Sequence, residues 1–353
     1  MHPTRRSVAL VAALLVGMVG CSSGAPGRPG DAARDPASTA TTGPTTTTGP
    51  DRSPGCGDEA PASGRSAVTV SSGAAQRSYI RYIPDGLSEG AAPPLVIDLT
   101  AYAPASLQES FSGFTKPDGD GTIKADEVGA IVVTPEPVNG KGLLTWNVAD
   151  AVGWTDDQRF VTDLVDDVAA RVCIDTGRVL AMGFAIGGVM ASRVACEQSE
   201  RITALVTVSG LWDPPDCMPE QAVPVLSFHG TNDHFLPFEG GVGDRVGLLN
   251  LSPETSAGLV AMASRPGAVA ASGAWAARNG CDETPEEQAV TEGVTRTSWA
   301  GCVAGVELYV VDGSHTWPGS NGMAAVEGLL GPVSTAITAN DVIWNFFEAQ
   351  RDT

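Results

Sequence analysis

Residues 181–191, AMGFAIGGVMA, join a short apolar run to a helix-compatible one through a glycine-rich turn. A strand-to-helix turn with the pattern Gly-x-Ser-x-Gly presents its serine as a nucleophile. Gly183 and Gly187 keep that spacing, but the central residue is Ala185. A methyl group has no lone pair to attack a carbonyl carbon and no proton to give to a base. The pattern therefore predicts a nucleophile turn without its nucleophile.

An acid and a histidine follow this turn in chain order. Asp233 and His315 each come shortly after an apolar, β-branched run. A carboxylate that orients a histidine, and a histidine that takes the nucleophile's proton, occur in this order in hydrolases built on an α/β sheet. His229 lies at the end of its own run and is expected to be a structural, hydrogen-bonding histidine. His234 lies beside the acid.

These residues require a sheet whose strands end at a common edge. Apolar runs predict buried strands at 77–83, 94–99, 130–135, 178–184, 204–210, 224–230 and 306–313. The later runs are continuous rather than alternating, which is typical of parallel strands covered on both faces. Helices are predicted at 156–172, 187–198, 271–280 and 338–351. The alternation of strand and helix predicts a single α/β domain with a doubly wound, mostly parallel sheet.

The N-terminus has the order of an export signal. Arg5 and Arg6 precede an apolar run that ends at Gly20 and is short for a membrane span. Gly20-Cys21 resembles a bacterial lipobox, which predicts a signal peptide over 1–20 and a lipid on Cys21. An ordinary signal peptide cleaved nearby is the alternative. We expect the protein on the extracytoplasmic face of the membrane, or secreted, with the membrane reached only through the lipid anchor.

The next segment, 21–55, is rich in Thr, Pro, Gly and Ser and has no periodic apolar residues. Such a composition cannot bury enough surface to offset the entropy of ordering, so we expect a disordered linker. The folded domain is then expected over 56–353. The whole chain has 21 basic and 41 acidic residues, which gives a formal net charge of −20. A negative surface repels phosphate backbones, so nucleic acid is not expected as a partner.

Cysteines also indicate export. Of the 7 cysteines, all but Cys21 lie in the folded part, and an even number in an exported domain favours disulfides. None has Cys-x-x-Cys spacing, so no structural metal is expected. Spacing leaves several connectivities open, among which we expect Cys56–Cys173, Cys196–Cys217 and Cys281–Cys302.

The segment 116–127, KPDGDGTIKADE, contains Asp118, Asp120 and Glu127 at the spacing of a calcium-binding loop. Its first position is Lys116, where a carboxylate ligand is needed, and a positive charge there opposes the ion. We expect a polar Asp/Gly loop, and neither a metal nor a cofactor.

Two segments, HGTND at 229–233 and GSHTWPG at 313–319, resemble the polyhydroxybutyrate depolymerase/feruloyl esterase family of secreted α/β hydrolases, which includes actinobacterial lipoproteins. RSYIRYIPDG, PLVIDL, ADEVGAIVVTPEP, TWN, RVLAMGFAIGGVMASRVAC and WAARNGC match further landmarks of that family in the same order. The resemblance covers roughly residue 56 to the C-terminus. It implies an α/β-hydrolase fold and descent from carboxylic-ester hydrolases.

By this resemblance Asp233 orients His315, and His315 is the base for a nucleophile at position 185. The family usually has His-Gly after the strand at 94–99, and its backbone contributes to the oxyanion hole. Here Thr100-Ala101 stand at that place, with Ile186 as the donor after the turn. An ester, polyester or carbohydrate-ester ligand is expected in a cleft lined by Tyr102, Trp146, Trp212 and Trp317.

The joint change at Ala185 and Thr100-Ala101 predicts a pseudoenzyme: an exported, lipid-anchored homologue of ester hydrolases with little serine-esterase activity. A first alternative is a working hydrolase that uses Ser314, Ser209 or a water activated by His315. Ser192 lies two turns down the predicted helix, on the wrong side of the turn. A second alternative is a cell-envelope binding module whose former cleft is only core.

Overall fold

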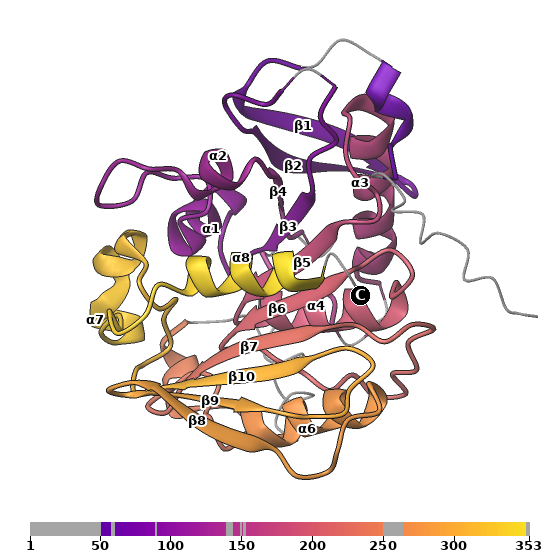
Figure 1. Cartoon of the computed structure of the whole chain (residues 1–353). Coiled ribbons are helices and arrows are strands. Elements are labelled where there is room, and N and C mark those ends of the chain that lie inside the picture. The colour runs from indigo at the N-terminus through magenta and orange to yellow at the C-terminus, as the bar shows by residue number, and fades with distance from the viewer. Residues whose placement is uncertain are drawn as a thin grey trace, which may run out of the picture. The chain divides into compact units, whose positions relative to one another are not determined.

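The computed structural model describes residues 51–350, apart from 58–60, 89, 139–143, 149, 151–152 and 250–263. Within these ranges one ten-stranded sheet has the order β1-β2-β4-β3-β5-β6-β7-β10-β9-β8 (Figure 1). The strands are β1 (Gly64–Ser72), β2 (Ala75–Ile83), β3 (Leu95–Leu99), β4 (Ile131–Pro135), β5 (Val179–Phe184), β6 (Ala204–Val208), β7 (Val225–Gly230), β8 (Glu286–Thr291), β9 (Val294–Ser298) and β10 (Val306–Val311).

The central strands, from β4 through β3, β5, β6 and β7 to β10, are parallel. Every residue of β3, β4, β5, β6 and β7 is buried, which explains why these runs are mostly apolar without a polar residue at every second position. The prediction of a doubly wound, mostly parallel sheet is confirmed. The antiparallel edge strands β1, β8 and β9 are not among the predicted strands, because β1 alternates with polar residues and β8 is exposed along its whole length.

Helices cover the sheet, and α8 crosses in front of the central strands in Figure 1. The predicted helices are present with shifted ends, and the apolar stripe of α3 is buried as expected. The side chain of Asp156 caps α3 by accepting a hydrogen bond from the Arg159 amide. The helices are α1 (Ala105–Ser112), α2 (Lys124–Val128), α3 (Asp157–Arg171), α4 (Ile186–Glu197), α6 (Ala268–Arg278), α7 (Glu327–Leu330) and α8 (Ala339–Ala349).

Three disulfides crosslink the domain, and they are the expected pairs Cys56–Cys173, Cys196–Cys217 and Cys281–Cys302.

The residues just before Cys56 are already packed against the domain, which differs from the expectation of a disordered linker up to residue 55. Ser53 is buried and its hydroxyl donates to the Val172 carbonyl at 2.8 Å. The structured part therefore begins at least as early as Asp51, while Cys21 and residues 1–50 lie outside the described residues.

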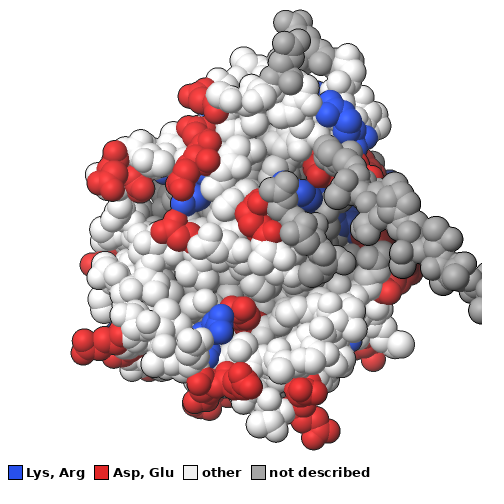
Figure 2. Space-filling view, in the orientation of Figure 1, with Lys and Arg blue, Asp and Glu red and all other residues white. Residues whose placement is uncertain are grey.

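The acidic surplus is visible at the surface. Figure 2 shows Asp and Glu side chains around the rim of one face, with only small groups of Lys and Arg among them. No helix among the described residues is long and apolar enough to cross a membrane.

In the Asp/Gly segment at 116–127, the Asp118 carboxylate accepts hydrogen bonds from the backbone amides of Asp120 and Thr122, both at 2.9 Å.

Asp98 is an acid inside the sheet, on β3. Its two carboxylate oxygens accept hydrogen bonds from the Gln108 amide at 2.7 Å and the Ser112 hydroxyl at 2.6 Å. Burial raises the pKa of Asp98 to about 7, although these two hydrogen bonds act in the opposite direction. At pH values between about 4 and about 7, Asp98 therefore keeps its proton in the folded protein but has released it in the unfolded chain.

Because the folded state binds this proton more tightly, the free energy of unfolding falls as pH rises from about 4 to about 7, by on the order of 1 kcal/mol per pH unit. We expect Asp98→Asn to remove this loss, since an amide keeps the shape and can donate to the Ser112 hydroxyl. Urea unfolding of both proteins across this window measures the effect. Parallel pH profiles for the two proteins would contradict it.

Candidate active site

Ala185 lies at the junction of β5 and α4, with φ 51° and ψ −121°. Positive φ is strained for a residue with a side chain and costs roughly 1–3 kcal/mol, so the surrounding structure must enforce it. The Ala185 amide donates to the Val208 carbonyl on β6 at 2.9 Å, and its own carbonyl accepts from the Val189 amide at 3.1 Å. The turn therefore has the strained backbone of a nucleophile elbow but presents a methyl group.

Three glycines make this turn possible. A Cβ on Gly183 would lie 2.4 Å from the Gly187 carbonyl carbon, and a Cβ on Gly187 would lie 2.1 Å from the Leu99 carbonyl oxygen. On β6's side, a Cβ on Gly210 would lie 2.2 Å from the Ala185 carbonyl oxygen. Each contact is with backbone, which cannot rotate away. The glycine spacing seen in the sequence is thus a packing requirement of the turn.

The structure brings Asp233 and His315 together from the loops after β7 and β10. His315 Nδ1 lies 2.6 Å from Asp233 Oδ2, and both side chains are buried. The other oxygen, Asp233 Oδ1, accepts hydrogen bonds from the amides of Phe235 and Leu236, each at 2.8 Å. This arrangement fixes the imidazole and leaves Nε2 facing away from the acid, as a general base requires.

Burial alone would raise the pKa of Asp233, but the neighbouring His315, its hydrogen bond and the loop amides lower it to about 2. His229 lies close by, with Nε2 at 3.6 Å from Asp233 Oδ2 and 2.7 Å from the Leu236 carbonyl oxygen. Burial lowers the pKa of His229 to about 4, so this histidine is neutral near pH 7. Its hydrogen bond to the loop backbone is the structural role expected from the sequence.

Two phenylalanines that are not among the predicted site residues lie against the His315 ring. The ring centroids of Phe184 and Phe235 lie 4.9 and 5.1 Å from that of the imidazole. The two aromatic rings restrict the orientation of the imidazole and cover much of its surface. Phe184 comes directly before Ala185 and Phe235 two residues after Asp233, and this closeness in sequence is the feature from which their place at the site could be predicted.

The other side of the turn is formed by the backbone of the predicted oxyanion loop. The Leu99 and Thr100 carbonyl oxygens approach Gly187 so closely that an added Cβ would lie 2.1 and 2.5 Å from them. Thr100 and Ala101 are buried beside the start of α4, where Ile186 is the first helical residue. The structure therefore places the three predicted oxyanion residues around one turn.

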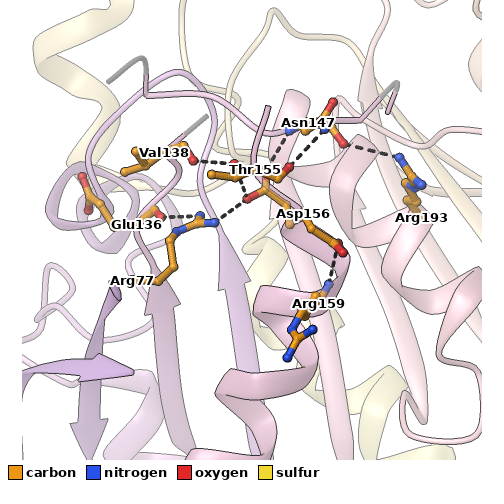
Figure 3. A network of polar contacts seen from close by, with 9 residues as sticks. Arg77, Glu136, Val138, Asn147, Thr155, Asp156, Arg159 and Arg193 are labelled. Carbon is orange, nitrogen blue, oxygen red and sulfur yellow. Dashed lines mark hydrogen bonds and ion pairs between the residues drawn. The ribbon is translucent and has the colours of Figure 1, made fainter. Parts of the chain in front are cut away.

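A network of hydrogen bonds and ion pairs supports the loop after β3 that contains Thr100. The Trp146 indole donates to the Thr100 carbonyl at 2.7 Å, and the Asn147 amide donates to Asp157 Oδ2 at 2.7 Å. The buried Arg77 guanidinium pairs with Asp157 Oδ1 at 2.8 Å, and Arg193 Nη1 donates to the Asn147 carbonyl at 3.4 Å (Figure 3). The start of α3 thus fixes the segment that positions the loop after β3.

The predicted ligand-lining residues fall into two groups. Tyr102 and Trp212 are partly exposed, so they can face a ligand. Trp146 and Trp317 are each 1% exposed, and the Trp317 indole donates to Asn340 Oδ1 at 3.0 Å. For these two, the prediction that they line a ligand cleft is wrong, because both side chains are buried in the core.

Hollows of 520, 670 and 680 Å³ open elsewhere on the described surface, and none is lined by Ala185 or His315.

The alternative serines do not meet His315. Ser209 has φ 53° and is fully buried, and its hydroxyl has no hydrogen-bond partner among the described residues. Ser314 packs against Gly331, where an added Cβ would lie 2.3 Å from its hydroxyl oxygen. Ser192 donates back to the Gly188 carbonyl at 2.8 Å within α4. None of the three hydroxyls is hydrogen-bonded to the imidazole.

A doubly wound sheet with a nucleophile elbow after β5, an acid after β7 and a histidine after the last parallel strand defines an α/β hydrolase. The chain has this fold. Residues 146–242 match the family model described as the Dienelactone hydrolase family. That segment contains the elbow and the acid.

Sequence relatives are esterases. The chain is 28% identical over 242 residues to feruloyl esterase B of Piromyces equi, an alignment that covers 66% of this chain and 40% of that protein. It is 30% identical over 203 residues to the putative esterase NocK of Nocardia uniformis, covering 53% and 57% of the two chains. A probable feruloyl esterase C of Aspergillus niger is 24% identical over 306 residues, covering 84% and 91%. The chain thus spans about half the length of the first two relatives.

Among solved structures, the acetyl xylan esterase from Aspergillus awamori has a TM-score of 0.49 and 14% identity, covering 80% of this chain and 99% of that one. The LpqC poly(3-hydroxybutyrate) depolymerase from Bordetella parapertussis has a TM-score of 0.36 and 18% identity, covering 49% and 67%.

Proposed function

We propose that this protein is a carboxylic-ester hydrolase homologue that has lost serine-esterase activity and retains the ligand site. The observation that carries the proposal is Ala185 in the strained elbow conformation, next to an intact Asp233–His315 pair. The pair can accept a proton, but position 185 has no proton to give and no oxygen to form an acyl intermediate. A water activated by His315 alone, without covalent catalysis, gives slow hydrolysis at best.

The proposed ligands are esters of the classes that the names of the sequence relatives give, feruloyl esters and acetylated xylan, or the polyesters of the depolymerase family that the sequence resembles. Tyr102 and Trp212, the partly exposed aromatic residues among those predicted, are the candidates to contact the acyl or sugar part. Burial raises the pKa of Tyr102 from its ordinary 10 to about 12, so its hydroxyl is protonated at neutral pH and in mildly alkaline buffer.

Comparing the wild-type protein with His315→Ala tests the loss of activity. We expect both proteins to hydrolyse p-nitrophenyl acetate and methyl ferulate at the same background rate, because the step that needs His315 has no nucleophile. A serine-directed phosphonate is expected to label neither Ser209 nor Ser314. Hydrolysis that disappears in His315→Ala would contradict the proposal, and a labelled serine would identify the substitute nucleophile.

We further propose that the protein is exported and anchored by a lipid on Cys21, with the segment before Asp51 as the tether. The supporting features are the charged-then-apolar N-terminus, the Gly20-Cys21 pair and the three disulfides of the folded domain. Metabolic labelling with a fatty-acid analogue is expected to mark the wild-type protein and not Cys21→Ser. Equal labelling of both would contradict the anchor.

A further inference from the structure

A hollow of 520 Å³ opens between the start of α3 and the second half of α4, and it contains no residue of the elbow. Trp154 and Thr155 line it from the turn before α3, Gln158 and Arg159 from α3, and Arg193 from α4 (Figure 3). Pockets of about 300–1,000 Å³ accommodate small ligands. The hollow is therefore large enough to hold one.

Two buried amide atoms at the wall of this hollow have no hydrogen-bond partner among the described residues: Gln158 Nε2, a donor, and Gln198 Oε1, an acceptor. Gln198 is 8% exposed, and its own Nε2 donates to the Gln158 carbonyl oxygen and to Gln158 Oε1, each at 3.1 Å. These two bonds fix which way each amide points, because exchanging oxygen and nitrogen in either amide, or in both, would set like groups against each other. An unpaired donor and an unpaired acceptor in one place lower stability, so they indicate an external polar group that pairs with them.

The charges around the hollow are already compensated. Arg193 Nη2 lies 2.7 Å from Asp150 Oδ2, and Arg193 Nε lies 2.7 Å from Glu197 Oε1. Arg159 Nε lies 3.4 Å from Asp163 Oδ2. Neither guanidinium is therefore free for an anionic ligand. Most of the described lining side chains are polar, which does not suit a lipid chain, so a ligand that fits here is polar and uncharged.

We propose that this hollow is a second binding site, for a neutral saccharide. The half-buried Trp154 indole offers a flat apolar surface to one sugar ring. A sugar hydroxyl both donates and accepts, so neighbouring hydroxyls satisfy Gln158 Nε2 and Gln198 Oε1 together. Gln158 is half-buried, so its terminal amide can turn toward the hollow while its backbone carbonyl still accepts from Gln198 Nε2.

A peptide fits this hollow less well. Extended peptides add to the free edge of a sheet, and helical ones need an apolar groove, whereas a turn and the polar sides of two helices form this hollow. The site does not involve Ala185 or His315, so it does not depend on whether the elbow hydrolyses esters.

Calorimetric titration of the full chain with xylotetraose, cellotetraose and tetragalacturonate tests the site. We expect at least one of the two neutral tetrasaccharides to bind with a dissociation constant of about 1 mM or lower, and the anionic one to bind at least about tenfold more weakly. These measurements use the unmodified protein, so they do not depend on how a variant folds. Absence of binding by both neutral saccharides, or equal affinity for the uncharged peptide N-acetyl-tetraglycine amide, would overturn the proposal.

Gln158→Met supplies the residue-level test, because it removes Nε2 but keeps the backbone carbonyl that accepts from Gln198. We expect this variant and Trp154→Ala each to weaken saccharide binding at least about tenfold. The matched control Gln288→Met, on the exposed strand β8, is expected to leave the affinity unchanged. Unchanged binding in both folded variants, or loss in Trp212→Ala instead of Trp154→Ala, would place the saccharide elsewhere and overturn the site. Ester hydrolysis by the wild-type protein bears only on the proposed function, so the two failures are distinguishable.

Discussion

Replacing Ala185 by serine is expected to raise the hydrolysis of p-nitrophenyl acetate by about 10³-fold over the wild-type rate. Loss of the serine alone costs roughly 10⁶-fold in a well-studied serine protease. Loss of one oxyanion donor costs roughly 10²–10³-fold, and Thr100-Ala101 replace the sequence usual at that place. The difference leaves a gain of about three orders of magnitude, since the elbow backbone and the Asp233–His315 pair are already in position.

Steady-state kinetics with the ester, and phosphonate labelling of the new serine, measure this gain. The double variant Ala185→Ser/His315→Ala is expected to lose it, because the serine then has no base. Ala270→Ser adds a serine at an exposed position of α6 and is expected to leave the background rate unchanged. If Ala185→Ser gives a folded protein that is neither active nor labelled, the change of Thr100-Ala101 has disabled the oxyanion side as well.

Gly187→Ala is expected to lower the free energy of unfolding by about 3 kcal/mol or more. The added Cβ would lie 2.1 Å from the Leu99 carbonyl oxygen and 2.5 Å from that of Thr100. Relief requires α4 and the loop after β3 to separate, and overpacking of this kind typically costs roughly 1–3 kcal/mol even when side chains can adjust. Backbone atoms on both sides of this contact leave less freedom than side chains would.

The same substitution at Gly273, inside α6, is the matched control. A Cβ there meets nothing within 4 Å, so Gly273→Ala is expected to stabilise the protein by about 0.5–1 kcal/mol through the helix propensity of alanine. Urea unfolding of both variants gives the two free energies. Similar effects of the two substitutions would show that the turn around Gly187 can relax, and that its close approach does not enforce the strain at Ala185.

The packing of the turn explains why the strained elbow conformation is present without a serine. A strained backbone at Ala185 is useful in an enzyme because it presents the nucleophile, and here it presents a methyl group. The close contacts of Gly183, Gly187 and Gly210 with backbone provide a reason that does not involve catalysis. The turn is built into the packing of β5, β6 and α4, so an alanine at position 185 does not by itself release it.

The sequence by itself determined the order of the parallel strands along the chain, the glycine spacing of the elbow, and the identities of Ala185, Asp233 and His315. Continuous apolar runs and a fixed Gly-x-x-x-Gly spacing are local properties, so they can be read from neighbouring residues. The edge strands β1 and β8 could not be read in this way, because their polar residues are compatible with a loop and only the pairing with β2 and β9 makes them strands.

Only the tertiary structure decided which residues surround the site. Trp146 and Trp317 were expected to face a ligand, but the core buries them, and Trp146 holds the Thr100 carbonyl from behind. Phe184 and Phe235 enclose the His315 ring from segments that lie far apart in the sequence. The burial and orientation of a side chain depend on which elements pack over it. That packing is set by contacts between distant segments, which no pattern of neighbouring residues contains.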